Sequence, residues 1–396
     1  FYISAALILV FSNLILLSKI IERFEIKKID YYPFLCLLFL IFINIFFYRI
    51  QEHGTDRSAQ ILILILFLFL ISFLNFEKNF KKNISIIFVL LGLIISLKAF
   101  YLLYLLISLP VIFILFKEKK LFLILDIFKN KFFWTFIILL LNILFVNFIN
   151  TGCLIYPIKF TCFETFSWSI GLQEVEKMIL HYENWSKAGM TPISRVENPN
   201  EHVQNFNWLP LWMSTYFFTK VSDFILGLLL VMIITTLFFF KKKKIITNIN
   251  KNIFFLIGIF FLFLIEWFLN HPALRYGGYC LIVILIFYPF SLVLEKYENS
   301  FNEKKYKFIC LILIIFSIFL TRNILRINNE INIYSYKPII DTYYSVEPKH
   351  FRIDKKFKNL IENFNNCKEG KDNCNKDLKP KVEKIFNNRY LFVNSK

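Results

Sequence analysis

Residues 49–60 bring two acids, a histidine and two arginines into one short stretch between apolar runs. Glu52 and Asp56 are four residues apart, so a single helical turn would place both carboxylates on one face. A carboxylate at a low-dielectric boundary can act as a general base, and arginines can hold a phosphate. We predict Asp56 or Glu52 as the catalytic base, with His53 and Arg57 as substrate contacts. The alternative is a solvated loop with a local ion pair.

A second polar turn, residues 271–278, contains His271, Arg275 and Tyr276 followed by two glycines. Arg275 could hold a lipid phosphate or a sugar carboxylate, and the glycines permit close backbone approach. Glu266 lies in the preceding apolar run, where an acid is commonly functional and paired with a cation. We predict a Glu266–Arg275 pair and substrate contacts from all four residues. The alternative is a tight turn whose arginine reaches lipid headgroups.

A long polar segment, residues 150–221, is too long for a simple connection and is expected to be folded or functional. Its densest polar and aromatic part is residues 182–189. We predict Trp185, Lys187 and Arg195 as substrate contacts, because aromatic rings stack on sugar faces. Tryptophans also gather at membrane interfaces, which is the alternative for each of them.

Several kinds of chemistry have no support in the sequence. It contains no G-x-x-x-x-G-K-[ST] or G-x-G-x-x-G phosphate loop, no G-x-S-x-G and no H-E-x-x-H. We therefore expect no nucleotide, no metal site and no cofactor, with a divalent cation left open. The net charge of +18 does not indicate nucleic acid, because the lysines occupy short loops between apolar runs.

The elements that must position these residues are membrane helices. The chain is 57% apolar, with 51 Phe and only 10 Gly, and its apolar runs approach the ~20 residues that a spanning helix needs. Only helices satisfy their own backbone polar groups in lipid. We predict an all-α polytopic bundle of about ten segments: 1–18, 33–48, 61–76, 84–97, 99–116, 132–149, 222–240, 253–270, 279–293 and 309–321.

The connections between these segments alternate in charge. Five of them, 19–32, 77–83, 117–131, 241–252 and 294–308, hold 21 Lys/Arg, whereas the alternate short connections hold four. The positive-inside rule places the rich set in the cytoplasm. Segments 84–97 and 99–116 must then be two short helices with Lys98 at an outward turn, which makes Lys98 another candidate substrate contact.

The cysteines agree with this topology. Two close pairs, Cys153/Cys162 and Cys367/Cys374, fall in segments placed outside, where disulfides persist. Four cysteines allow three pairings, and the short-range pairing is the simplest. Zinc is the rival interpretation, but neither pair has C-x-x-C spacing.

We therefore divide the chain into four parts. Helices occupy 1–149 and 222–321, an extracytoplasmic loop occupies 150–221, and an extracytoplasmic cap occupies 322–396, with helices expected near 354–366 and 378–388. The chain begins inside an apolar run without Met, so we expect a fragment that lacks its first helices. No oligomeric state follows from the sequence.

Together these features resemble the GT-C superfamily of integral-membrane glycosyltransferases. The acidic stretch 52–56 resembles the first-loop motif of that group, and 151–157 resembles a loop that follows a helix in bacterial membrane proteins of this kind. The resemblance implies a polyprenyl-phosphate sugar donor, a lipid or glycan acceptor, and a bacterial inner membrane. A polysaccharide polymerase or ligase and a transporter of lipid-linked sugars are the alternatives.

Overall fold

The protein was studied as a computed structural model. The structure describes residues 2–49, 55–74, 80–117, 119, 127–166, 168–190, 196–242, 251–297, 300–334 and short stretches within 362–393. The chain divides into two compact units. One comprises Phe1–Thr165 and Ser169–Phe319, and the other Phe166–Trp168 and Leu320–Lys396.

Eight helices in the described residues are long and apolar enough to cross a membrane, which indicates a multi-pass membrane protein. They are α1 (Tyr2–Glu25), α3 (Asp56–Leu74), η3 with α5 (Ala99–Ile107, Ser108–Lys117), α7 (Lys131–Thr151), α10 with η6 and α11 (Leu209–Trp212, Met213–Val221, Ser222–Phe239), α12 (Lys251–Asn270), α13 (Gly278–Glu295) and α14 (Phe301–Tyr334). Two shorter apolar helical stretches are α2 with η1 (Tyr31–Ile41, Phe42–Phe46) and α4 (Phe80–Leu97).

The predicted helical membrane bundle is thus confirmed, and three details of the prediction are wrong. The helix predicted to start at 222 begins at Leu209, because 209–221 winds into a short α-helix and a π-helix. The last apolar helix continues past 321 to Tyr334. Within 378–388, where a helix was expected, β1 (Lys381–Phe386) pairs antiparallel with β2 (Arg389–Val393). Most of 354–366 lies outside the described residues.

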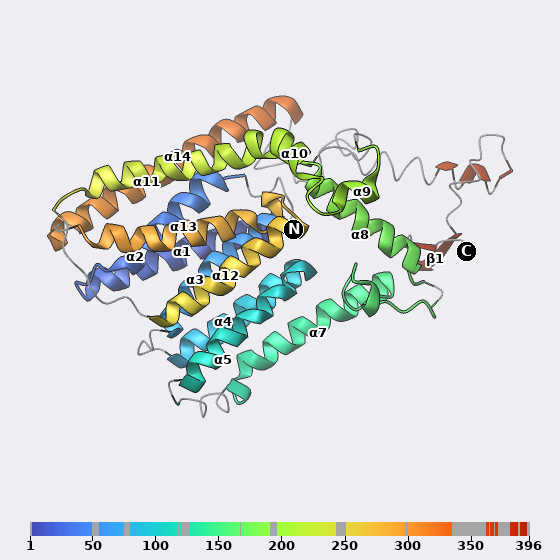
Figure 1. The fold of residues 1–396 in the computed structure, drawn as a ribbon, viewed down its shortest axis with the longest axis horizontal. Helices are drawn as coiled ribbons and strands as arrows, with labels where there is room; N and C mark the ends of the chain where they lie inside the picture. Colours follow the sequence, from blue (N-terminus) through green and yellow to red (C-terminus); the bar gives the residue numbers. More distant parts are fainter. Residues whose placement is uncertain are drawn as a thin grey trace. The chain divides into compact units, whose positions relative to one another are not determined.

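Helix α3 is at the centre of the helical unit. Every residue of its span is buried, and it packs against α1, α4, α12 and α13 (Figure 1). Helix α13 also packs on α2, and α7 packs on α4. Because α3 is enclosed, polar groups at its first turn must find partners within the protein.

Helix α7 lies at the edge of the bundle, where only 6% of its apolar window is buried. Its ends are set by local signals: the Asn130 side chain caps the first turn, and Gly152 adopts the left-handed conformation (φ 76°) at the last.

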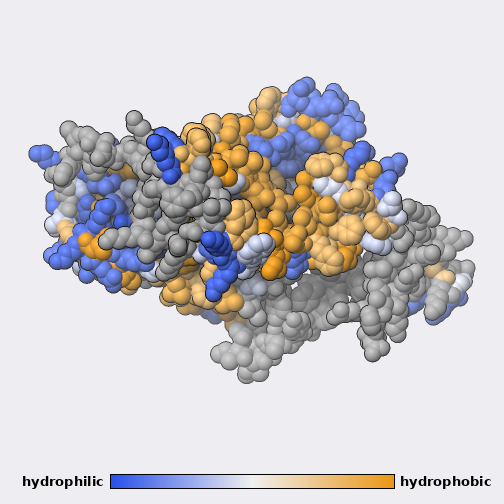
Figure 2. All heavy atoms as spheres, turned by 90° about the horizontal axis from the view of Figure 1, so that it is seen from below, coloured by the Kyte–Doolittle hydropathy of each residue, from blue (hydrophilic) through white to orange (hydrophobic). Residues whose placement is uncertain are grey.

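In the space-filling view, apolar residues form a broad band over the helices, with hydrophilic residues toward the ends (Figure 2). Such a band is the surface that lipid covers.

Candidate functional site

The candidate site is an ion cluster at the first residue of α3. One oxygen of Asp56 accepts a hydrogen bond from the Lys98 ammonium at 2.7 Å, and the other accepts from Nε of Arg275 at 3.0 Å. The Asp56 side chain is 5% exposed, whereas those of Lys98 and Arg275 are 30% and 35% exposed. The carboxylate therefore lies beneath two cations that reach the surface.

Lys98 and Arg275 are positioned by breaks between helices. Lys98 adopts an extended conformation between α4 and the 3-10 helix η3, as expected for the predicted turn between two helices. Arg275 lies in the 3-10 turn η7 (Leu274–Tyr276) that joins α12 to α13. Gly277 follows with φ 108°, a value that L side chains rarely adopt, so glycine permits this turn.

Gln60, one turn along α3 from Asp56, attaches the η7 turn to the central helix. Its amide nitrogen donates to the carbonyl of Arg275 at 3.0 Å, and its amide oxygen accepts from the backbone N–H of Cys280 at 3.1 Å. The fully buried Gln60 thus contacts both the η7 turn and the first turn of α13, and it fixes the backbone beside Asp56. The sequence did not identify Gln60.

Three aromatic side chains bind the backbone of residues 272–274, which lead into the η7 turn. None of the three was predicted as a site residue from the sequence. Indole N–H groups of Trp212 and Trp267 donate to the carbonyls of Pro272 and Ala273 at 2.7 and 2.9 Å. The Tyr216 hydroxyl accepts from the backbone N–H of Leu274 at 3.0 Å. These bonds satisfy backbone groups of a buried, irregular segment, which is otherwise costly.

The ring of Tyr276 is the common neighbour of the charged groups. The Lys98 ammonium lies 4.4 Å and the Arg275 guanidinium carbon 5.3 Å from its centroid, within cation–π range. The His271 ring contacts it edge-on at 6.1 Å. The predicted residues Lys98, Arg275 and His271 therefore come together around the ring of Tyr276, and Asp56 binds the two cations.

His271 is expected to be neutral at pH 7. Burial lowers the pKa of its imidazole below the ordinary value, and the charges of Lys187 and Lys98 lower it further, while Glu183 opposes them. Its ring also contacts Phe100. A neutral imidazole beside two cations can accept or donate a hydrogen bond to a ligand.

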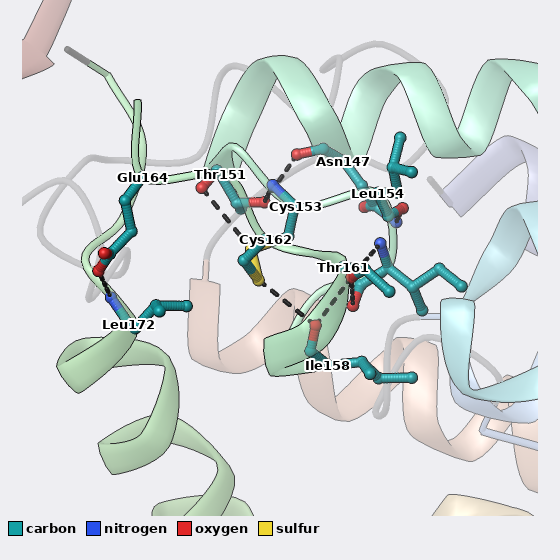
Figure 3. The surroundings of a disulfide bond; sticks show 10 residues. Asn147, Thr151, Cys153, Leu154, Ile158, Thr161, Cys162, Glu164 and Leu172 are labelled. Carbon is teal, nitrogen blue, oxygen red and sulfur yellow. Dashed lines mark hydrogen bonds between the residues drawn. A yellow bond between two sulfur atoms is a disulfide. The ribbon is translucent and has the colours of Figure 1, made fainter. Parts of the chain in front are cut away.

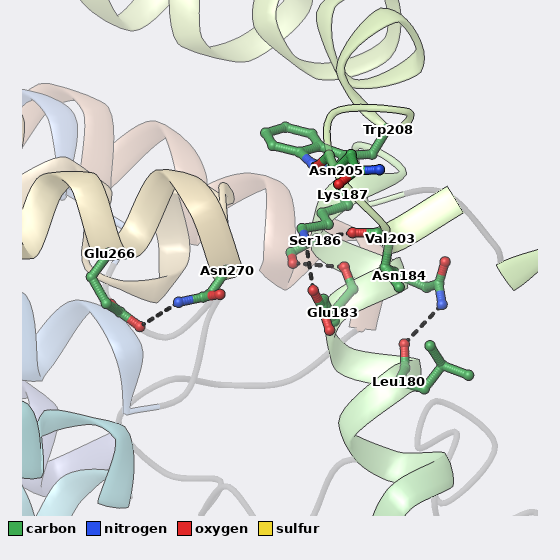
Figure 4. Close-up of polar contacts among 10 residues, drawn as sticks. All are labelled: Leu180, Glu183, Asn184, Ser186, Lys187, Val203, Asn205, Trp208, Glu266 and Asn270. Carbon is green, nitrogen blue, oxygen red and sulfur yellow. Dashed lines mark hydrogen bonds and ion pairs between the residues drawn. The ribbon is translucent and has the colours of Figure 1, made fainter. Parts of the chain in front are cut away.

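Helix α8 (Leu172–Lys187) carries the predicted contacts Trp185 and Lys187. The buried Lys187 ammonium donates to Glu183 at 2.6 Å and to the carbonyl of Val203 at 3.1 Å, and it lies over the Trp208 ring (Figure 4). Through these contacts, Lys187 joins the end of α8 to the segment that contains Val203 and Trp208. Trp185 stacks on His181 at 6.2 Å.

The predicted Glu266–Arg275 pair is wrong. Arg275 pairs with Asp56, whereas Glu266 accepts a hydrogen bond from Asn270 at 3.2 Å (Figure 4). Glu266 is one helical turn from Asn270 on α12, so its partner is local. The buried Arg57 donates to the backbone carbonyl of Arg49 and lies over the Phe47 ring.

Other predicted residues lie outside the cluster or outside the described residues. Glu52, His53, Arg195 and Cys374 belong to the latter. Cys153 and Cys162 form a disulfide after α7 (Figure 3), and Cys367 is also disulfide-bonded. No group of three or more His, Cys, Asp or Glu side chains able to hold a metal ion occurs in the part of the chain that the structure describes.

Comparison with known proteins gives one match. Residues 1–282 match a family described as "Domain of unknown function (DUF8201)", and this range includes α3, η3, α8 and the η7 turn. No curated protein and no solved structure matches the chain.

Proposed function

We propose that this chain, which belongs to the DUF8201 family, is an integral-membrane glycosyltransferase that moves a sugar from a polyprenyl-phosphate donor to an extracytoplasmic glycan or lipid acceptor. The observation that carries the proposal is the cluster of one buried carboxylate and two partly exposed cations at the end of α3. It lies where a bundle of apolar helices meets its polar connections.

The charge of the cluster fits a lipid-linked phosphate. Asp56 contributes one negative charge and Lys98 and Arg275 two positive charges, which leaves one positive charge among these three residues. A phosphodiester between a sugar and a polyprenol carries a single negative charge. Arg presents a fork of donors to phosphate oxygens and Lys a compact charge, so the pair can bind this group.

In the proposed reaction, the acceptor hydroxyl oxygen attacks the anomeric carbon and its proton passes to Asp56. The bond from that carbon to the phosphate oxygen breaks, and its electron pair leaves with the polyprenyl phosphate. Lys98 and Arg275 stabilise the charge that develops on the phosphate. Both Asp56 oxygens are occupied before substrate binds, so the proposal requires the donor phosphate to draw a cation away from the carboxylate. Glu52 is the alternative base.

The proposed orientation puts this cluster on the outer side of a bacterial inner membrane. Asp56, Lys98 and Arg275 belong to three different connections that are poor in Lys/Arg. Their direct contacts require the three connections to lie at one end of the bundle. That agreement supports the topology drawn from the positive-inside rule.

The test is transfer of radiolabelled sugar from the lipid-linked donor into periplasmic glycan, in cells that express each variant equally. Asp56→Asn should lower incorporation by about 100-fold or more, the usual effect of losing a general base. Lys98→Gln with Arg275→Gln should weaken donor binding as well. Lys177→Gln, which removes a cation from an exposed ion pair on α8, is the matched control and should keep full activity.

Two outcomes would reject the proposal in favour of another function. Loss of activity in Arg195→Ala with full activity in Asp56→Asn would favour a polysaccharide polymerase or ligase that uses outer-loop arginines. Movement of labelled, chemically unchanged lipid-linked sugar across liposomes by the purified protein would favour a transporter.

A further inference from the structure

The segment that follows α7, residues 153–163, is closed into a compact loop. The disulfide joins Cys153 to Cys162, nine residues apart (Figure 3). Inside the loop, the Thr161 hydroxyl accepts from the backbone N–H of Ile155 at 3.1 Å and is 2.8 Å from the Ile158 carbonyl. The covalent closure and these internal hydrogen bonds restrict the conformations of the loop backbone.

This closed loop presents apolar side chains outward. Phe160 is 88% exposed, and Leu154, Ile158 and Phe163 are also exposed. Single exposed apolar residues are ordinary on a protein surface, but a contiguous group marks an interaction site. The loop contains one charged residue, Lys159, and no acid.

The apolar surface of the loop continues that of the preceding helix. From the middle of α7 to its end, the exposed side chains include Leu141, Phe145 and Ile149. The ring of Phe163 contacts that of Phe148 on α7 edge-on, with centroids 5.9 Å apart. Because α7 is a spanning helix with most of its surface uncovered, this ring contact joins the exposed apolar side chains of the loop to the surface of α7 that meets lipid.

We propose that residues 153–163 form an interfacial anchor that inserts into the membrane leaflet at which α7 ends. The partner is therefore a lipid surface. A loop with two phenylalanines, a tyrosine and one lysine suits the boundary between hydrocarbon and headgroups, where aromatic and amphipathic side chains gather. This inference does not depend on the glycosyltransferase proposal.

The anchor has a consequence for the site because it is joined to α8. Lys159 of the loop pairs with Glu176 of α8, and the Glu164 side chain accepts from the backbone N–H of Leu172 at the start of α8, at 2.8 Å. Helix α8 also carries Glu183, whose charge acts on His271. Lipid binding by the loop would thus hold the start of α8, through the contacts of Lys159 and Glu164, at the leaflet that the loop enters.

The test places a polarity-sensitive fluorescent amino acid at position 160 in the full chain, reconstituted in lipid nanodiscs. This probe avoids a new thiol beside the disulfide. Position 141 on α7 is the control within the membrane span. Position 181 on α8, exposed and outside the spans, is the aqueous control. Quenchers are lipids brominated near the headgroup, lipids brominated deep in the acyl chain, and iodide in the buffer.

The expected result is quenching of position 160 by the shallow lipid in preference to the deep lipid and iodide. Position 141 should be quenched by the deep lipid and position 181 by iodide. Iodide quenching at 160 equal to that at 181, without lipid quenching, would overturn the proposal. In the double variant Cys153→Ser/Cys162→Ser, shallow-lipid quenching at 160 should be lost, and unchanged quenching would overturn the role given to the closed loop.

Discussion

Replacing Asp56 with Asn should destabilise the protein even though the side chain keeps its size. The change removes the negative charge on which Lys98 and Arg275 both converge, at 2.7 and 3.0 Å. Two cations would then stay close together without their counter-ion. The expected loss follows from desolvation and repulsion, and it does not require any substrate.

The magnitude follows from the two bonds and their exposure. A hydrogen bond to a charged group contributes about 1.5–3 kcal/mol net. Asp56 is nearly buried, but about a third of each cation is exposed, so water and salt recover part of the loss. We expect Asp56→Asn to lower the free energy of unfolding by about 3 kcal/mol, and Lys98→Gln or Arg275→Gln alone by about 1–2 kcal/mol.

The triple variant distinguishes an ion cluster from three independent contacts. With Asp56→Asn, Lys98→Gln and Arg275→Gln combined, neither charge nor counter-ion remains, so the loss should be no greater than in Asp56→Asn alone. Unfolding in detergent micelles with increasing SDS, followed by circular dichroism, measures these differences. Additive losses in the triple variant, or a change below about 0.5 kcal/mol in Asp56→Asn, would refute the reasoning.

Three further predictions concern other parts of the structure. Burial lowers the pKa of His271 in the folded protein, so as pH falls through about 6.5 the unfolded chain binds this proton before the folded protein does. The free energy of unfolding should therefore decrease below that pH. His271→Gln should remove this part of the pH dependence. Cys153→Ser opens a nine-residue loop and should cost about 2–3 kcal/mol of unfolding free energy in the same micelle assay, with no further loss when Cys162 is also replaced. Gly189→Ala should lower the free energy of unfolding by about 2 kcal/mol or more, because Gly189 has φ 70° and an added Cβ would approach the Thr215 hydroxyl to 2.1 Å. Unchanged stability would contradict that packing.

The sequence predicted the membrane helices well because a long apolar run matches the length and composition that a membrane-spanning helix needs. The position of Lys98 between two helices also followed from the alternation of charge. The start of the helix at Leu209 did not, because the apolar residues of 209–221 are interrupted by Pro210, a serine, threonines and Lys220. Two residues of its π-helix, Thr215 and Tyr216, pack closely on Gly189 of the preceding segment, a long-range contact that a local pattern does not record.

The members of the candidate site were easier to predict than their pairing. Asp56, Lys98, Arg275 and His271 stood out as polar residues between apolar runs. Arg275 was assigned to Glu266 because that acid is close in sequence, but its partner is 219 residues away. Gln60 and the three aromatic residues that hold the η7 turn act through backbone groups, so their side chains carry no charge pattern that would identify them.

In the proposed topology, the few cations of the short outer connections carry more information than the many in the Lys/Arg-rich connections. The four short-connection cations are Arg49, Arg57, Lys98 and Arg275. Two of them bind Asp56, and Arg57 binds the backbone of Arg49. If the proposed topology holds, positive residues in these connections oppose the orientation that the rest of the chain favours, and their specific contacts would offset that cost. Under the proposed function, these exceptions to the positive-inside pattern include Lys98 and Arg275, the two residues proposed to bind the donor phosphate.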